Sequence, residues 1–302
     1  IAILFVSHKL NEVFEISENF TILRSGELVA SGSTAELNDK KFSYYMTGRE
    51  FNQRRFKPVN LSEKPIFEAN QVGLPGFFED VSFSLHRGEI IGITGLLDSG
   101  RTELALSMFG IKPISHGSFS INGKTVLIQS PRDAIKHNLG YVPEDRLTEG
   151  LFLPQSIADN IVISEIDRLA KKAGIVDQVK RKTEIDHWIK ELAIATPDPN
   201  NACQTLSGGN QQRIVLAKWL ACNLDILVLN GPTVGVDIGS KHDIHGILHE
   251  LASKGLGLIL ISDDLPEVVE NCSKILVMKA GRIVAELKAE ETDEKTILSY
   301  ML

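Results

Sequence analysis

The sequence is poor in several features that mark particular classes of protein. It has only three cysteines, Cys203, Cys222 and Cys272, and they lie far apart in the chain. Their number and spacing fit neither a disulfide framework nor a zinc site, and they favour a reduced, cytosolic compartment. No apolar run approaches the roughly 18–20 residues that a membrane-spanning helix needs. Lys and Arg number 32 against 39 Asp and Glu, and the net charge of −7 argues against a general nucleic-acid-binding surface.

Apolar residues are plentiful enough for a sizeable core. They make up 43% of the 302 residues, which excludes a disordered chain, and the length favours about two domains. The chain opens at Ile1 with IAILFVSHKL, and this run predicts a buried strand. Because a native terminus rarely begins inside a core element, we interpret the sequence as a fragment.

A repeat organises the chain. Residues 5–32 align without gaps on residues 260–287, at a constant offset of 255 positions. Each copy predicts a strand, a helix, a strand, a glycine turn and a strand. Two tandem copies of one domain, with only the tail of the first present, explain the pattern. The identical pairs include Ser7/Ser262, Glu12/Glu267 and Gly26/Gly281.

The boundaries of the two copies can be predicted from the composition of the segment between them. We predict that residues 1–48 are the C-terminal part of a first, truncated domain and that residues 66–302 are the second domain. Residues 49–65 are polar and basic and contain Pro58 and Pro65, which is typical of a surface linker.

The second copy has the pattern of an α/β domain. Near-continuous Ile, Leu and Val runs separated by helical stretches predict a mostly parallel sheet covered by helices on both faces. Residues 156–195 are charged and helix-favouring, and they predict a helical insertion. The predicted strands are Ile90–Thr94, Ile226–Leu229, Leu258–Ile261 and Ile275–Met278.

A glycine-containing loop follows the first of these strands. Gly95, Gly100, Arg101 and Thr102 have the spacing of a phosphate-binding loop, G-x-x-x-x-G-K-[ST], with Arg in place of Lys. Backbone N–H groups and a helix N-terminus hold phosphate in such a loop, and the Thr hydroxyl can bind Mg²⁺. Arg101 keeps the charge in a different geometry, while Asp98 puts an anion where an anion should bind. A strand–helix turn without a ligand remains the alternative.

A Ser-Gly-Gly loop, in LSGGNQQ at residues 206–212, leads directly into an apolar helix and predicts a second phosphate-binding helix N-terminus. Here the sequence resembles the ATPases of ABC transporters, whose signature motif this run matches. The runs GLLDSGRTEL, YVPEDR and GVDIGS resemble the second domain of tandem ATPase subunits of monosaccharide importers and of their nucleoside-importer relatives. The resemblance covers essentially the whole chain. It implies an ABC-type P-loop ATPase core with an antiparallel β subdomain and a helical subdomain at about residues 150–215.

The resemblance also implies that this domain's own ATP site is altered. The strand at 226–229 corresponds to one that normally ends in an Asp that organises Mg²⁺ and a Glu that polarises water. Asn230 and Gly231 occupy those positions, so the hold on the metal is weakened and the general base is missing. Asp263 replaces a switch His that contacts the γ-phosphate, whereas the first copy keeps it as His8.

Other nucleotide contacts implied by the resemblance are retained. Thr102 and Glu144 would hold Mg²⁺ weakly, and Asp237 belongs to the loop that crosses to the partner domain. Phe77 and Phe78 could stack on adenine or belong to the core. The full set expected to contact ATP is Gly95, Asp98, Ser99, Gly100, Arg101, Thr102, Glu103, Glu144, Ser207, Gly208, Gly209, Gln211 and Asp237.

The resemblance predicts the ATP-binding subunit of an importer of a small sugar, peripheral on the cytoplasmic face of the membrane. Such ATPase domains dimerise head to tail, so we expect one hydrolytic site and one degenerate site. The implied partners are transmembrane permease subunits, a second ATPase domain and, indirectly, a solute-binding protein, but no nucleic acid. We expect this chain alone to be inactive or very slow. A nucleoside importer and a regulatory ATPase-like protein without a transport role are the alternatives.

Overall fold

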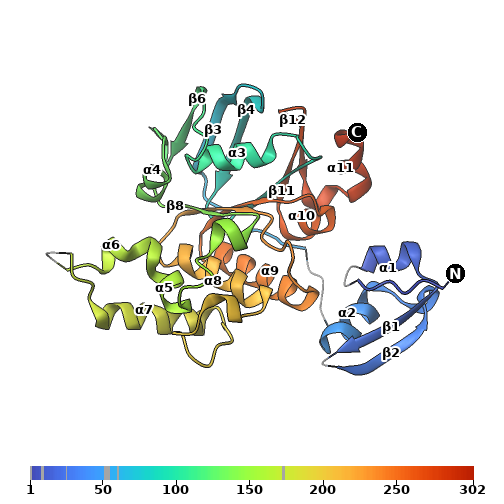
Figure 1. The fold of residues 1–302 in the computed structure, drawn as a ribbon. Helices are drawn as coiled ribbons and strands as arrows, with labels where there is room; N and C mark the ends of the chain where they lie inside the picture. The colour runs from blue at the N-terminus through green and yellow to red at the C-terminus, as the bar shows by residue number, and fades with distance from the viewer. Residues whose placement is uncertain (1, 8–9, 25, 51–54, 60, 172–173) are drawn as a thin grey trace.

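The computed structural model describes residues 2–7, 10–24, 26–50, 55–59, 61–171 and 174–302. From residue 65 onward it has two sheets with helices packed around them, and a small module precedes them in the chain (Figure 1). Its α/β architecture agrees with the class predicted from the sequence.

The main sheet has six strands in the order β12-β11-β5-β10-β9-β8. All neighbouring strands are parallel except β11 and β12, which form an antiparallel hairpin at the edge. Every residue of β5, β8, β9 and β10 is buried, because helices or strands cover both faces, and this explains their continuous apolar sequences. The four predicted strands are confirmed. The bounds are β5 (Ile90–Gly95), β8 (Leu139–Val142), β9 (Ile226–Asn230), β10 (Gly257–Ile261), β11 (Lys274–Lys279) and β12 (Arg282–Lys288).

The second sheet is the antiparallel β subdomain, with strands in the order β4-β3-β6-β7. Aromatic side chains form its core, since the ring of Phe67 lies 5.9 Å from that of Phe83 and 5.4 Å from that of Phe119. The bounds are β3 (Pro65–Leu74), β4 (Phe78–His86), β6 (His116–Ile121) and β7 (Lys124–Val126).

Helices cover the main sheet and form the predicted insertion. Helices α5, α6 and α7 occupy the segment 156–195 and lie beside α8 in Figure 1. The bounds are α3 (Arg101–Met108), α4 (Pro131–Lys136), α5 (Ile157–Val162), α6 (Ile166–Leu169), α7 (Gln178–Glu191), α8 (Gly208–Leu220), α9 (Ile238–Ser253), α10 (Leu265–Asn271) and α11 (Glu294–Met301). In the part of the chain that the structure describes, no helix is both long and apolar enough to span a bilayer.

The N-terminal module departs from the sequence prediction in one respect. It contains α1 (Leu10–Ile16), β1 (Asn19–Arg24) and β2 (Glu27–Ser33), in the order expected from the repeat, and then α2 (Asp39–Thr47), which lies beyond the aligned residues. Residues 2–7, however, form no strand, and most of them are exposed, so the predicted buried strand is wrong there. Their counterpart β10 lies between β5 and β9, and residues 2–7 have no such neighbours here.

The N-terminal module packs against the start of α9. Ile238 packs on the small apolar cluster of the module, which is centred on Ile22 and Phe42. Arg49, just after α2, pairs with Asp243 of α9 at 3.4 Å, and Asp243 also pairs with Arg213 of α8 at 2.7 Å. A short chain of contacts therefore runs from the module to α8, the helix that begins within LSGGNQQ.

Candidate functional site: two loops that precede helices

A loop with two left-handed residues joins β5 to α3. The backbone φ is +63° at Asp98 and +90° at Gly100. Aspartate tolerates this region better than most residues, whereas a Cβ at Gly100 would lie 2.5 Å from the carbonyl oxygen of Phe77. Ser99 is buried, and its hydroxyl has no hydrogen-bond partner among the described residues. The loop is thus folded tightly around a hydroxyl group that an anion could engage.

Arg101 is the first residue of α3 and is largely buried. Its Nη1 donates a hydrogen bond to the carbonyl oxygen of Gly95 at 2.5 Å, and its Nη2 lies 3.6 Å from Oδ2 of Asp263. Asp263 follows β10, and its side chain is 73% exposed. Besides adding negative charge near the loop, Asp263 is therefore an ion-pair partner of the cation in that loop.

The carboxyl end of β9 lies beside the same loop. Asn230 is buried, and its Nδ2 donates to the hydroxyl of Tyr141 at 3.5 Å, while burial raises the pKa of Tyr141 to about 12. Gly231 has a φ of +58°, and a Cβ there would lie 3.0 Å from Cγ2 of Val234 and 3.1 Å from Cγ of Glu144. This position cannot take a side chain without strain.

Thr102, Glu144 and Asn230 line one open pocket of about 490 Å³. The structure therefore brings the two predicted metal ligands together with the end of β9. Their donor set is one hydroxyl, one carboxylate and one neutral amide, which suits Mg²⁺ poorly compared with a set of carboxylates. Among the described residues, no group of three or more His, Cys, Asp or Glu side chains could hold a metal ion.

A second cluster of loops surrounds the N-terminus of α8. Ser207 is exposed there, and two glycines follow it. A Cβ at Gly208 would lie 2.8 Å from Nη2 of Arg146, and a Cβ at Gly209 would lie 2.2 Å from Oγ of Ser240. The two glycines let α8 begin in direct contact with these neighbours.

Arg146 and Asp237 hold the rest of this cluster in place. Arg146 donates to the carbonyl oxygens of Val234 at 2.6 Å and of Gly235 at 3.1 Å. Asp237 caps α9, since its carboxylate accepts hydrogen bonds from the backbone N–H and the hydroxyl of Ser240 at 3.0 and 2.8 Å. Segments that follow β8, precede α8 and precede α9 thus meet at one surface.

Comparison with known proteins assigns the chain to a family. Residues 78–234, which include both loops, match the family described as ABC transporter. The chain belongs to the ABC transporter family. It is 36% identical over 299 residues to the ribose import ATP-binding protein of Bacillus subtilis, and 39% identical over 303 residues to the xylose import ATP-binding protein of Thermoanaerobacter pseudethanolicus. These alignments cover 99% and 98% of this chain, which spans about 60% of the length of either relative.

Solved structures share the fold of this ABC domain. A nucleotide-free ATP-binding cassette from an ABC transporter superposes with a TM-score of 0.68 and 22% identity, over 78% of this chain and 96% of that one. The ADP conformation of another ATP-binding cassette gives a TM-score of 0.66 at 21% identity, over 79% and 95% of the two chains. At these identities the likeness concerns the fold alone.

The other predicted positions of the ABC domain differ in accessibility. Glu103 on α3 pairs with Lys112 at 3.4 Å, whereas Gln211 is buried in α8 and is not accessible to a partner in this structure. Phe78 is a core residue, but Phe77 is 43% exposed, and the ammonium of Lys112 lies 4.3 Å from the centre of its ring. Of the two aromatic residues, only Phe77 is placed to contact an external group.

The buried carboxylate of Glu267, which follows Asp263 in the chain, was not identified from the sequence. Glu267 of α10 accepts hydrogen bonds from the hydroxyls of Thr233 and Ser262 at 2.6 and 2.5 Å, and its Oε1 lies 2.7 Å from Nε2 of His245. Burial raises the pKa of Glu267, but hydrogen bonds with His245 and Ser262 and the charges of His245 and Lys241 together outweigh this and lower the pKa to about 2. This carboxylate joins the ends of β9 and β10 to α9.

The repeat contained a signal for this network. Ser7 and Glu12 are the first-copy counterparts of two of its members, and the Ser7 hydroxyl donates to Oε2 of Glu12 at 2.6 Å. The same Ser–Glu contact therefore occurs in both copies. The predicted switch residue between them, His8, lies outside the described residues.

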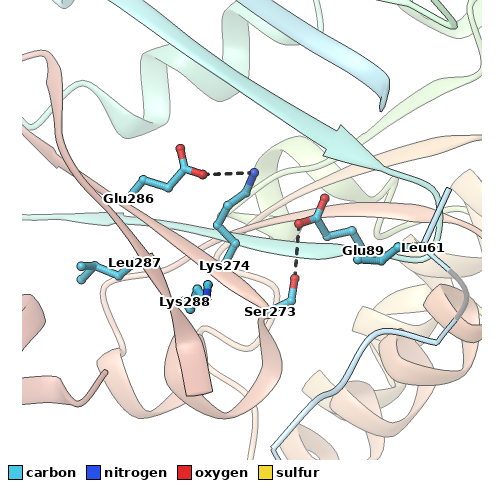
Figure 2. A pocket seen from close by; sticks show the side chains of 7 residues that line it. All are labelled: Leu61, Glu89, Ser273, Lys274, Glu286, Leu287 and Lys288. Carbon is cyan, nitrogen blue, oxygen red and sulfur yellow. Dashed lines mark hydrogen bonds and ion pairs between the residues drawn. The ribbon is translucent and has the colours of Figure 1, made fainter. Parts of the chain in front are cut away.

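A second pocket lies at the other ends of the main-sheet strands, near the starts of β5 and β11. Figure 2 shows two polar contacts in it: Lys274 pairs with Glu286 at 3.5 Å, and the Ser273 hydroxyl donates to Glu89 at 3.5 Å. Leu61 and Leu287 complete the apolar part of its wall. None of the predicted site residues lines this pocket.

Proposed function

We propose that this chain is part of an ATP-binding subunit that powers the import of a monosaccharide. The importer function of the two relatives supports this proposal, because they align over almost the whole chain. The subunit would bind ATP and Mg²⁺, associate with transmembrane permease subunits on the cytoplasmic face of the membrane and act indirectly on a solute-binding protein.

The proposed organisation is two tandem ATPase domains. Residues 1–48 would close the first domain, residues 49–65 would link the two, and residues 66–302 would form the second, with a helical subdomain at about 150–215. The repeat supports this division, as do the matching order of elements in the N-terminal module and in β11, β12 and α11.

The observation that carries the functional proposal is the contrast between the two loops. The phosphate loop has Arg101 tied to Asp263 and lies beside Asn230 and Gly231, so hydrolysis in this site is opposed. The loop at Ser207 keeps an exposed hydroxyl at a helix N-terminus. We propose that it completes the ATP site of the first domain, where His8 supplies the switch.

Within that partner site, this chain's residues would act by binding and orienting. The hydroxyl of Ser207 and the N–H groups of Gly208 and Gly209 would donate to the γ-phosphate, where negative charge develops during transfer. Asp237 would position the loop that crosses to the partner. In this domain's own site, Gly95–Thr102 would hold the phosphates, and Thr102 and Glu144 would bind Mg²⁺ weakly.

The test is Gly208→Asp in the assembled transporter. A Cβ at this position displaces the guanidinium of Arg146, which holds the crossing loop, and the carboxylate repels phosphate. We expect ATP hydrolysis to fall at least about 100-fold, the usual effect of losing transition-state donors. Gly246→Asp is the matched control, because Gly246 is exposed on α9 with open space around it. Unchanged hydrolysis in Gly208→Asp would refute the proposal.

A further inference from the structure

The phosphate loop of this domain keeps the backbone shape of a phosphate cradle, but the cations near it already have protein partners. The loop from Gly95 to Gly100 keeps its left-handed glycine, and α3 begins directly after it. The buried hydroxyl of Ser99 is close to Gly95, since a Cβ there would lie 2.5 Å from its Oγ, and it has no partner among the described residues. Loop N–H groups and this hydroxyl suit one anionic phosphate group.

A further phosphate would extend into a region whose cations are already bonded to protein groups. The guanidinium of Arg101 is shared between the carbonyl of Gly95 and the carboxylate of Asp263. Arg146, which lines the adjoining pocket, donates to two backbone carbonyls. An additional phosphate must therefore compete with Asp263 for Arg101, or place its oxygens beside a carboxylate.

The end of β9 offers no compensation for the added charge. Asn230 is neutral and buried, and Gly231 has no side chain, while Glu144 adds another carboxylate to the pocket. A metal ion that would screen a triphosphate thus finds a poor donor set here.

We propose that this loop is a binding site for a nucleoside diphosphate and discriminates against the triphosphate through Asp263. The inference rests on the proposed function only in taking the loop to bind nucleotide. The terminal phosphate of a diphosphate occupies the cradle and leaves the Arg101–Asp263 pair in place, whereas the third phosphate of a triphosphate disrupts it.

The experiment is calorimetric titration of this chain with ADP and with ATP, each in EDTA and in millimolar Mg²⁺. We expect ADP to bind at least about tenfold more tightly than ATP in both buffers. Asp263→Asn keeps the size of the side chain and removes its charge, so ATP affinity should rise about tenfold while ADP affinity changes less than threefold. Asp186→Asn, an equal change of charge on exposed α7, should alter neither affinity.

Several outcomes would overturn the inference. ATP binding as tightly as ADP to the unmodified chain is one, and an equal effect of Asp263→Asn on both nucleotides is another. Binding of neither nucleotide would also overturn it, but it would leave the Ser207 loop's role intact, because Gly208→Asp in the assembled transporter tests that separately. Thermal melting of each variant verifies that it is folded.

Discussion

Gly231 shows how one residue determines what chemistry a site can regain. Its left-handed backbone, together with the closeness of the Val234 and Glu144 side chains, makes the position favour glycine.

Asp98, by contrast, is a non-glycine residue that suits a left-handed backbone. Its negative charge is unfavourable in a phosphate loop, but Asp tolerates a φ of +63°, so backbone geometry accounts for part of its presence there.

Gly231→Glu should therefore destabilise the domain and fail to restore hydrolysis. The positive φ and the Cβ contacts at 3.0 and 3.1 Å should lower the free energy of unfolding by about 1–3 kcal/mol, measured by urea denaturation. Gly246→Glu is the control, because that glycine has open space in an exposed helix, where Glu is a better helix former. Equal stability of the two variants would contradict the argument.

At the scale of elements, Glu267 ties three segments together. Its carboxylate bonds to the loop after β9 through Thr233, to the end of β10 through Ser262 and to α9 through His245. Such a network is stable only while every member is satisfied, because an unpaired polar group in the interior is costly.

Glu267→Gln should lower the free energy of unfolding by about 2–4 kcal/mol at neutral pH. Because the pKa of Glu267 is lowered to about 2, the unfolded chain binds more protons than the native one between about pH 4.5 and 2. Stability from this group is present above that window and is lost as the pH falls through it, so the variant should show a shallower acid slope.

Glu270→Gln on the same helix is the control for this substitution. Burial is the main influence on Glu270 and raises its pKa, so neutralising it should cost little. If both substitutions lowered the unfolding free energy equally, as measured by urea denaturation across pH, the network would not be the cause.

The sequence predicted the elements better than the contacts between them. Strands β5, β9, β10 and β11 followed from continuous apolar runs, because burial on both faces needs only local composition. The same reasoning failed for residues 2–7, since a strand also needs neighbours that the local sequence cannot specify. The Arg101–Asp263 pair joins residues 162 positions apart, and no local pattern encodes such a contact.

At the scale of the whole molecule, the chain has a phosphate loop and, at Ser207, a loop that matches the ABC signature motif. In the proposed head-to-tail pair, each loop would belong to a different ATP site. The contacts from Arg49 through Asp243 to Arg213 connect the N-terminal module with the helix that carries the signature loop. We expect this arrangement to make activity a property of the assembled subunit.

The chain alone should therefore hydrolyse ATP no faster than background. Loss of a general base by itself reduces rates by about 10²–10⁴, and Asn230 and Gly231 stand where the family resemblance places the two carboxylates. The measurement is steady-state phosphate release with Mg²⁺ and ATP. Turnover within minutes that survives Arg101→Ala would contradict the assignment of a single hydrolytic site.

The left-handed conformation at Gly231 also bears on how this site can evolve. Because the backbone at Gly231 has a conformation that favours glycine, a single codon change to an acidic residue meets strain before it offers any catalytic benefit. A side chain at this position would require Val234 and Glu144 to move, since their side chains lie closest to it. The proposed loss of hydrolysis in this domain would therefore be hard to reverse, which would leave later substitutions free to adapt the loop to another use.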